Sequence, residues 1–255
     1  EMWKDFQDFT FNQIEELMTG YGSVDILWLD GGWVRPDSTI NEEFRSWGYD
    51  IPKWEQDINM HRIAGMARQK QPGILIVDRT VHGPYENYRT PEQSIPPDAQ
   101  PFPFETCMTM TQSWGHTKNP RYKSSEFLIH TLIDVVSKGG SFLLNIGATP
   151  EGTLEKEAYD RLEDIGKWIT VNGEGIYATR KWQIYKDSET VRYTKSKDGK
   201  YLYVHVLEWP GNELVLEHSG LNKKTRATLL GHSGRIKSTL IGNELTLKIP
   251  QKLQD

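Results

Sequence analysis

Hydrophobic and polar positions at the start of the chain predict a helix followed by a strand. The helix precedes Gly20-Tyr21-Gly22, and we expect these apolar residues on one side of it: Phe6, Phe9, Ile14, Leu17 and Met18. Residues Val24 to Asp30 form a short, mostly apolar run closed by Gly31-Gly32, which is typical of a buried parallel strand. Asp30 is therefore expected at the carboxyl end of a strand.

The same pattern then repeats. A second helix is predicted over residues 55 to 70, ending at Gln71-Pro72-Gly73, with these residues on its apolar side: Met60, Ile63, Ala64 and Ala67. Ile74 to Val77 is predicted to be another buried strand, and Asp78 and Arg79 follow it. A strand, a helix and a further strand in this order imply a parallel sheet.

The middle of the chain continues the alternation after a long loop. Residues 80 to 105 are rich in proline, tyrosine and glutamate, which is typical of a lid or a binding loop. We expect a strand near residues 107 to 111, a buried helix over 126 to 138 and a strand over 141 to 147. A further helix, from about Leu154 to Val171, is predicted to bury one apolar stripe: Ala158, Leu162, Ile165 and Ile169.

The pattern changes after Trp182. Residues 201 to 207 alternate between apolar and polar positions, and Gly, Asn and Ser recur at short intervals beyond them, which predicts a small antiparallel β domain. Upstream, polar residues at strand ends indicate a TIM-type (β/α)8 barrel, because the active site of that fold lies there. About four strands are found where a closed barrel has eight. We therefore predict a partial barrel over residues 1–180 and a β-sandwich over residues 181–255.

Composition excludes several classes of protein. The 255 residues carry a net charge of -5 without a long basic run, which argues against nucleic acid as a partner. No apolar stretch approaches the roughly 18 residues of a membrane span. The single cysteine, Cys107, cannot form an internal disulfide, and no pattern suggests a metal or other cofactor. The first residues also lack the layout of a signal peptide.

Trp28-Leu29-Asp30-Gly31-Gly32-Trp33 is the most informative string. A carboxylate at a strand end, followed by two small residues and flanked by indoles, suits the anomeric centre of a glycosidase. The alternative is that Asp30 only caps a turn, since Asp-Gly is a common turn dipeptide.

A series of segments extends this string from the start of the chain to about Trp182: Gln13 to Leu17, Leu27 to Gly31, Val77 to Arg79, Arg89 to Gln93, Glu105 to Thr109, Ser113 to Gly115, and Gly139 to Gly152. Together, and in this order, they resemble the α-L-fucosidases of glycoside hydrolase family 29. Linked motifs are far more specific than any single one. The resemblance implies a retaining exo-glycosidase that hydrolyses terminal α-L-fucosyl residues of oligosaccharides or glycoconjugates.

The resemblance also implies the catalytic pair. Asp30 matches the nucleophile that forms the covalent glycosyl-enzyme, and a retaining enzyme needs a second carboxyl group about 5 Å away. Glu92 fits this second role best, because an aromatic residue, here Tyr88, stands four positions before the glutamate in this family. Glu86 and Glu105 stay open as alternatives.

Further residues are implied to bind the substrate. Arg79 is expected to contact the sugar or to orient Asp30, with an ion pair to Asp78 as the alternative. Trp114 is expected at the methyl side of fucose, with core packing as its alternative, and Trp33 at the aglycone side. Three other polar side chains near the predicted site have ordinary structural explanations as well: His82, His116 and Asn145.

Members of this family carry further βα units upstream, with paired histidines and a tryptophan that bind the fucose hydroxyls. Because no such units precede Glu1, we interpret the chain as a piece of a longer enzyme. Two other functions stay open: a non-catalytic glycan-binding protein, and a retaining glycosidase for another sugar. Bacterial relatives are often exported, so we expect a periplasmic or secreted protein.

Overall fold

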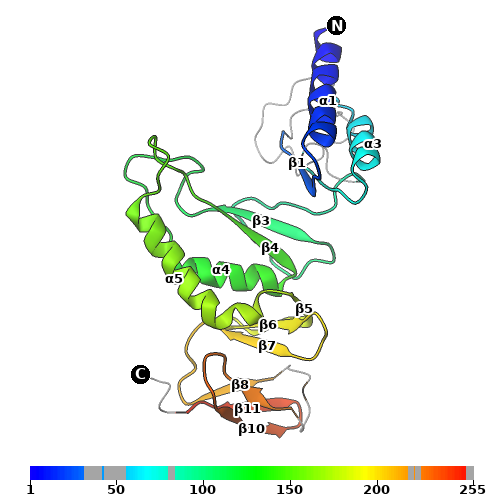
Figure 1. Cartoon of the computed structure of the whole chain (residues 1–255). Helices are drawn as coiled ribbons and strands as arrows, with labels where there is room; N and C mark the ends of the chain where they lie inside the picture. The colour runs from blue at the N-terminus through cyan, green and yellow to red at the C-terminus, as the bar shows by residue number, and fades with distance from the viewer. Residues whose placement is uncertain (32–41, 43–55, 80–83, 218–220, 222–224, 251–255) are drawn as a thin grey trace. The chain divides into compact units, whose positions relative to one another are not determined.

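The computed structural model describes residues 1–31, 42, 56–79, 84–217, 221 and 225–250 (Figure 1). The chain forms two compact units, Glu1–Thr90 and Pro91–Asp255. Helices and parallel strands make up the described part of the first unit, whereas the second continues from such elements into antiparallel strands.

The described part of the first unit holds two helices and two strands in the predicted order: α1 (Met2–Gly20), β1 (Ile26–Leu29), α3 (Met60–Lys70) and β2 (Leu75–Asp78). β1 and β2 pair in parallel, with Leu29 beside Asp78 at their carboxyl ends. α3 begins where the Asn59 side chain accepts a hydrogen bond from the backbone N–H of Arg62, which satisfies one of the free donors of a helix start. The predicted parallel sheet is confirmed.

α1 buries a different stripe from the one predicted. Ile14 and Met18 are buried as expected, but Phe6, Phe9 and Leu17 are exposed, so their predicted place on the buried side is wrong. The buried stripe continues instead from Ile14 through Phe11 to Trp3, because the core of this unit contacts that side of the helix. Helical periodicity left two neighbouring stripes possible, and packing chose between them.

β1 and β2 are not buried along their whole length, so the prediction of buried strands is wrong in part: Val77 is buried, but Leu75 on the same face of β2 is exposed. Leu27 and Ile76 lie in the core with α1 and α3. Ile26 and Leu75, which are neighbours in the register, are 47% and 42% exposed. Side chains alternate between the faces of a sheet, and the described helices of this unit pack on the face of Leu27 and Ile76.

The second unit begins with two further βα pairs: β3 (Phe104–Thr109), α4 (Ser125–Ser137), β4 (Gly140–Asn145) and α5 (Lys156–Asn172). β3 and β4 pair in parallel from Phe104 beside Gly140 to Thr109 beside Asn145. β3 begins three residues before the predicted strand and ends at Thr109. Gly140 is required, because a Cβ there would lie 2.4 Å from the ring of Phe104.

The predicted buried stripe of α5 is wrong in part. Ala158 is fully buried, whereas Leu162 is exposed. Ile165 and Ile169 line an open cavity of about 820 Å³ between α4, α5 and the start of β4. Ile165 is partly buried against the core around Ala158, but the cavity beside the second half of the helix leaves the apolar stripe incompletely packed.

Two antiparallel sheets complete the unit. β5 (Thr179–Ser188), β6 (Val191–Ser196) and β7 (Leu202–Val206) form the first, in sequence order. The second has the order β8-β11-β10-β9, with these bounds: β8 (Glu213–Leu216), β9 (Ala227–Thr228), β10 (Arg235–Ile241) and β11 (Glu244–Lys248). Tyr193 of the first sheet and Leu216 of the second are both fully buried in one shared core. The partial barrel with an antiparallel β domain after it is confirmed as the fold class.

A buried histidine joins α5 to the first of these sheets. His205 of β7 is buried against the short 3-10 helix Gly173–Gly175, which follows α5 directly. Thr194 of β6 donates from its hydroxyl to the carbonyl of Gly175 at 2.7 Å, and its Oγ1 lies 2.9 Å from His205 Nε2. Because the hydroxyl proton is used on the carbonyl, His205 Nε2 donates to Thr194. Burial lowers the pKa of His205 to about 4, so the ring is neutral near pH 7.

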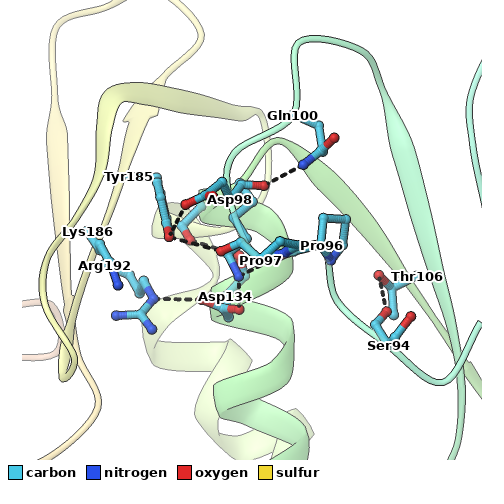
Figure 2. A network of polar contacts seen from close by, with 12 residues as sticks. Ser94, Pro96, Pro97, Asp98, Gln100, Thr106, Asp134, Tyr185, Lys186 and Arg192 are labelled. Carbon is cyan, nitrogen blue, oxygen red and sulfur yellow. Dashed lines mark hydrogen bonds and ion pairs between the residues drawn. The ribbon is translucent and has the colours of Figure 1, made fainter. Parts of the chain in front are cut away.

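A polar network ties α4 to β6 and to the segment before β3 (Figure 2). Asp134 accepts hydrogen bonds from Lys138 and Arg192, and Lys138 also donates to the carbonyl of Pro96 at 2.8 Å. Tyr185 donates to the carbonyl of Pro97 at 3.2 Å. The helix of the partial barrel and the antiparallel sheet are therefore joined by charged hydrogen bonds. The predicted boundary between residues 180 and 181 stays a prediction.

Candidate active site

Asp30 and Arg79 lie side by side at the carboxyl ends of β1 and β2. The register that pairs Leu29 with Asp78 makes the next two residues neighbours, and the Arg79 N–H donates to the carbonyl of Leu29 at 3.1 Å. Arg79 Nη1 lies 3.6 Å from Asp30 Oδ1, which also accepts from the N–H of Gly31 at 3.1 Å. The Asp30 side chain is 64% exposed, so its carboxylate is open to solvent.

Trp28 also contacts the guanidinium of Arg79. The guanidinium carbon lies 5.2 Å from the centre of the Trp28 ring, within the range of a cation–π contact. Trp28 and Asp30 both come from one short segment, with side chains two positions apart. The guanidinium therefore lies close to both an indole and a carboxylate. The side chain of Asp78, the predicted alternative partner of Arg79, lies outside the described residues.

Glu92 and Trp114 form a second pair within the other compact unit. Residue 92 makes a parallel bridge with Cys107 of β3, and the indole N–H of Trp114 donates to Glu92 Oε1 at 3.2 Å. Both side chains are exposed. The loop after β3 is packed closely, since a Cβ on Gly147 would lie 2.4 Å from the backbone nitrogen of His116. Two predicted site residues that are 22 positions apart therefore meet.

The competing glutamates have different surroundings. The Glu86 side chain is only 9% exposed and lies 3.5 Å from Arg89 in an ion pair. Glu105 lies in β3, and one of its carboxylate oxygens is buried without a hydrogen-bond partner among the residues that the structure describes. The Glu92 carboxylate is exposed and accepts a hydrogen bond from the exposed indole of Trp114.

The remaining predicted positions divide into two groups. Trp33 and His82 lie outside the described residues. His116 contacts Glu155 at 2.8 Å, so it forms a polar contact across the loop. Asn145 ends β4 with a buried side-chain oxygen that has no hydrogen-bond partner in the described part of the chain. No group of three His, Cys, Asp or Glu side chains that could hold a metal ion occurs among the described residues.

Known protein families match nearly the whole chain. The sequence model of the α-L-fucosidase family matches residues 1–174, and that of the α-L-fucosidase C-terminal domain matches residues 183–255. The chain belongs to the α-L-fucosidase family. Its resemblance to glycoside hydrolase family 29 is thereby confirmed.

Individual α-L-fucosidases show the same likeness. The tissue α-L-fucosidase of Homo sapiens is 30% identical over 261 residues, and the α-L-fucosidase of Branchiostoma floridae is 31% identical over 258 residues. These alignments cover 95% and 96% of this chain but 51% and 54% of those proteins. The chain therefore spans about half the length of the curated fucosidases that it matches.

Solved fucosidase structures share the fold. α-L-Fucosidase isoenzyme 1 from Paenibacillus thiaminolyticus has a TM-score of 0.80 at 27% identity, over 99% of this chain and 60% of that one. The Thermotoga maritima α-fucosidase, solved in complex with fucose, has a TM-score of 0.75 at 26% identity, over 98% and 53%. Among the residues that the structure of this chain describes, no helix is long and apolar enough to span a membrane.

Some residues of the site were not singled out from the sequence. Trp28 appeared only as one of two flanking indoles, and its contact with Arg79 depends on the pairing of two strands. Gln93 and Thr109 appeared only inside longer motifs, although their side chains hydrogen-bond each other directly beside Glu92. Hydrogen bonds between residues far apart in sequence leave no periodic signal that could have revealed them.

Proposed function

We propose that this chain carries the catalytic pair of a retaining α-L-fucosidase, with Asp30 as the nucleophile and Glu92 as the general acid and base. The observation that carries the proposal is the Asp30–Arg79 pair at the carboxyl ends of adjacent parallel strands, in a chain of the α-L-fucosidase family. The carboxyl ends of the strands are the edge where barrel enzymes place their chemistry.

In the first step an oxygen of the Asp30 carboxylate bonds to the anomeric carbon of the fucosyl residue. The bond from that carbon to the glycosidic oxygen breaks, and the oxygen keeps the electron pair while it takes a proton from Glu92. This step requires an ionised nucleophile beside a protonated acid. The Arg79 guanidinium lies 3.6 Å from Asp30, so a positive charge is close to the carboxylate that attacks.

In the second step a water molecule releases the sugar. Glu92, now ionised, takes a proton from the water while the water oxygen bonds to the anomeric carbon. The ester bond to Asp30 breaks and its electron pair returns to the carboxylate. Two inversions at one carbon retain the α configuration of the product.

Exposed aromatic surface supports the choice of a sugar substrate. Trp114 is half-exposed and bonded to Glu92, so its ring stands next to the proposed proton donor. Fucose is a 6-deoxy sugar with an apolar methyl group, and an indole face suits such a group. We propose that Trp114 and Arg79 contact the fucosyl residue and that Trp33 faces the aglycone.

The test is hydrolysis of an aryl α-L-fucoside by the chain alone and by a form extended upstream, each beside its Asp30→Ala variant. Release of the aryl alcohol that disappears in the variant supports both the reaction and the nucleophile. Hydrolysis by the extended form alone would show that the site needs upstream residues. Binding of fucose without hydrolysis by either folded form would favour a glycan-binding protein, and cleavage of a different glycoside would favour another sugar.

A further inference from the structure

Gln93, the residue after Glu92, has a backbone conformation that long side chains rarely adopt. Its φ angle is +51°, in the left-handed region. The chain runs beside β3 up to this point, because the Cys107 N–H donates to the carbonyl of Pro91 at 3.0 Å and the Gln93 N–H donates to the carbonyl of Cys107 at 2.8 Å. The chain therefore changes direction directly after Glu92. The conformation of Gln93 thus determines the direction in which the Glu92 side chain points.

The side chain of Gln93 is paired with the end of β3. Its Nε2 donates to Thr109 Oγ1 at 3.1 Å, and its Oε1 accepts from the Thr109 backbone N–H at 3.3 Å. Thr109 is buried, and its hydroxyl donates to the carbonyl of Thr111 at 2.6 Å. Gln93 Oε1 lies farther from that hydroxyl, at 3.3 Å, so the proton is used on the Thr111 carbonyl and Oγ1 accepts from Gln93 Nε2. Two hydrogen bonds thus offset the unfavourable backbone of Gln93.

Hydrogen bonds at the end of β3 also hold the segment that leads to Trp114. The Thr111 hydroxyl donates to the carbonyl of Ser113 at 3.2 Å, one residue before Trp114. Lys123 Nζ donates to the carbonyls of Thr109 and Thr111 at 2.6 and 2.9 Å, and burial lowers the pKa of this amine. The hydrogen bond from Trp114 to Glu92 then closes a ring of contacts that begins and ends at the proposed proton donor.

The segment beyond Gln93 is also held. Thr106 donates to the carbonyl of Ser94 at 3.2 Å, as Figure 2 shows. Lys138 donates to the carbonyl of Pro96. With contacts on both sides of Gln93, the turn cannot relax in one direction without breaking hydrogen bonds in the other. A change at Gln93 is therefore transmitted to Glu92.

We propose that Gln93 is a positioning residue that holds the Glu92 carboxylate against the Trp114 indole. The catalytic consequence, delivery of a proton to the glycosidic oxygen, rests on the proposed function. The placement itself is a property of this chain and can be measured without any reaction.

The first experiment measures that placement by NMR of the ¹⁵N-labelled chain. The indole N–H signal of Trp114, assigned with Trp114→Phe, is followed while the Glu92 carboxyl group titrates. We expect the signal to move with that titration in the unchanged chain and in the control Gln183→Ala, which alters an exposed glutamine of β5. In Gln93→Gly, where the left-handed backbone is free of strain but the amide is gone, the dependence should be lost.

Variants at Thr109 separate the hydrogen bond from the backbone. Thr109→Ser keeps the hydroxyl and should behave like the unchanged chain, whereas Thr109→Val should behave like Gln93→Gly. A Trp114 signal that still follows Glu92 in Gln93→Gly would overturn the inference. So would a signal that never follows Glu92 in the unchanged chain.

The second experiment uses whichever form of the enzyme cleaves aryl fucosides. In Gln93→Gly, kcat/KM for the phenyl fucoside should fall about 10-fold to 100-fold, since general acid catalysis contributes about 10²-fold to 10⁴-fold. The 2,4-dinitrophenyl fucoside, whose leaving group departs without a proton, should lose less than about 3-fold by the same reasoning. Equal losses for both substrates would indicate general damage and overturn the inference. Absence of hydrolysis, with the Trp114 signal still dependent on Gln93, would count against the proposed function and support the placement.

Discussion

Arg192 of β6 donates from Nε to Asp134 Oδ1 of α4 at 2.6 Å, and Lys138 donates to the other oxygen of the same carboxylate at 2.7 Å. The side chains of Asp134 and Arg192 are 16% and 11% exposed. One carboxylate thus serves two cations at the junction between a barrel helix and the antiparallel sheet. Removing it leaves two poorly solvated positive charges facing each other, which is the unfavourable case for a largely buried ion pair.

Asp134→Ala is therefore expected to lower the free energy of unfolding by about 3 to 5 kcal/mol. Urea unfolding followed by circular dichroism measures the effect. The exposed pair of Lys156 and Asp160, which lie 2.7 Å apart on α5, gives the matched control. Asp160→Ala should change the stability by about 1 kcal/mol or less. Similar losses in the two variants would contradict the structural role of Asp134.

His205 predicts a pH-dependent stability. Its pKa falls to about 4 in the folded chain from an ordinary value of 6.5, so the unfolded state binds more protons between these two values. The stabilisation is complete above the unfolded pKa and is lost as the pH falls towards the folded one. Between pH 7 and pH 4 we expect a loss of about 3 kcal/mol from this group.

The comparison for His205 is His205→Gln, which keeps a donor for Thr194 but does not titrate. Carboxyl groups contribute equally to the pH dependence of both proteins, so the difference between their unfolding curves isolates the histidine. The variant should lose less stability than the unchanged chain on acidification. Parallel curves would show that His205 is protonated without penalty.

Arg79 predicts a graded loss of activity in the form of the enzyme that hydrolyses aryl fucosides. Arg79→Met removes the charge beside Asp30 and should lower kcat/KM by about 10²-fold to 10³-fold, as for loss of one electrostatic contact in an active site. Arg79→Lys keeps the charge without the planar group that contacts the Trp28 ring. Its kcat/KM should therefore lie between that of the unchanged enzyme and that of Arg79→Met. Arg62→Met, at an exposed pair with Asp8, is the control and should leave kcat/KM near its original value.

Azide rescue distinguishes the three candidate glutamates. A variant without its general acid and base still forms the glycosyl-enzyme from an activated fucoside, and azide can then attack in place of water to give α-L-fucosyl azide. We expect this product from Glu92→Gly and not from Glu86→Gly or Glu105→Gly. Asp30→Gly should instead give β-L-fucosyl azide, since azide replaces the nucleophile and inverts the anomeric carbon once. Chromatography against both standards identifies the product, and α-azide from Glu105→Gly would move the acid role to that residue.

The sequence by itself determined the kinds of elements and their order. Periodicity located α1, α3, α4 and α5 and the apolar runs of β1 to β4, because each such signal is local and repeats along the chain. It also placed Asp30 at the end of a strand, and the linked motifs identified the family that the matches at residues 1–174 and 183–255 then confirmed.

Only the tertiary structure decided which residues meet. The register of β1 with β2 places Arg79 beside Asp30, and a bridge between residue 92 and Cys107 brings Glu92 to Trp114. Packing also decided that Leu162 is exposed, although its spacing fitted a buried stripe. Strand register and helix rotation are set by contacts between distant residues, and a pattern along one segment carries no information about the partner that the segment finds.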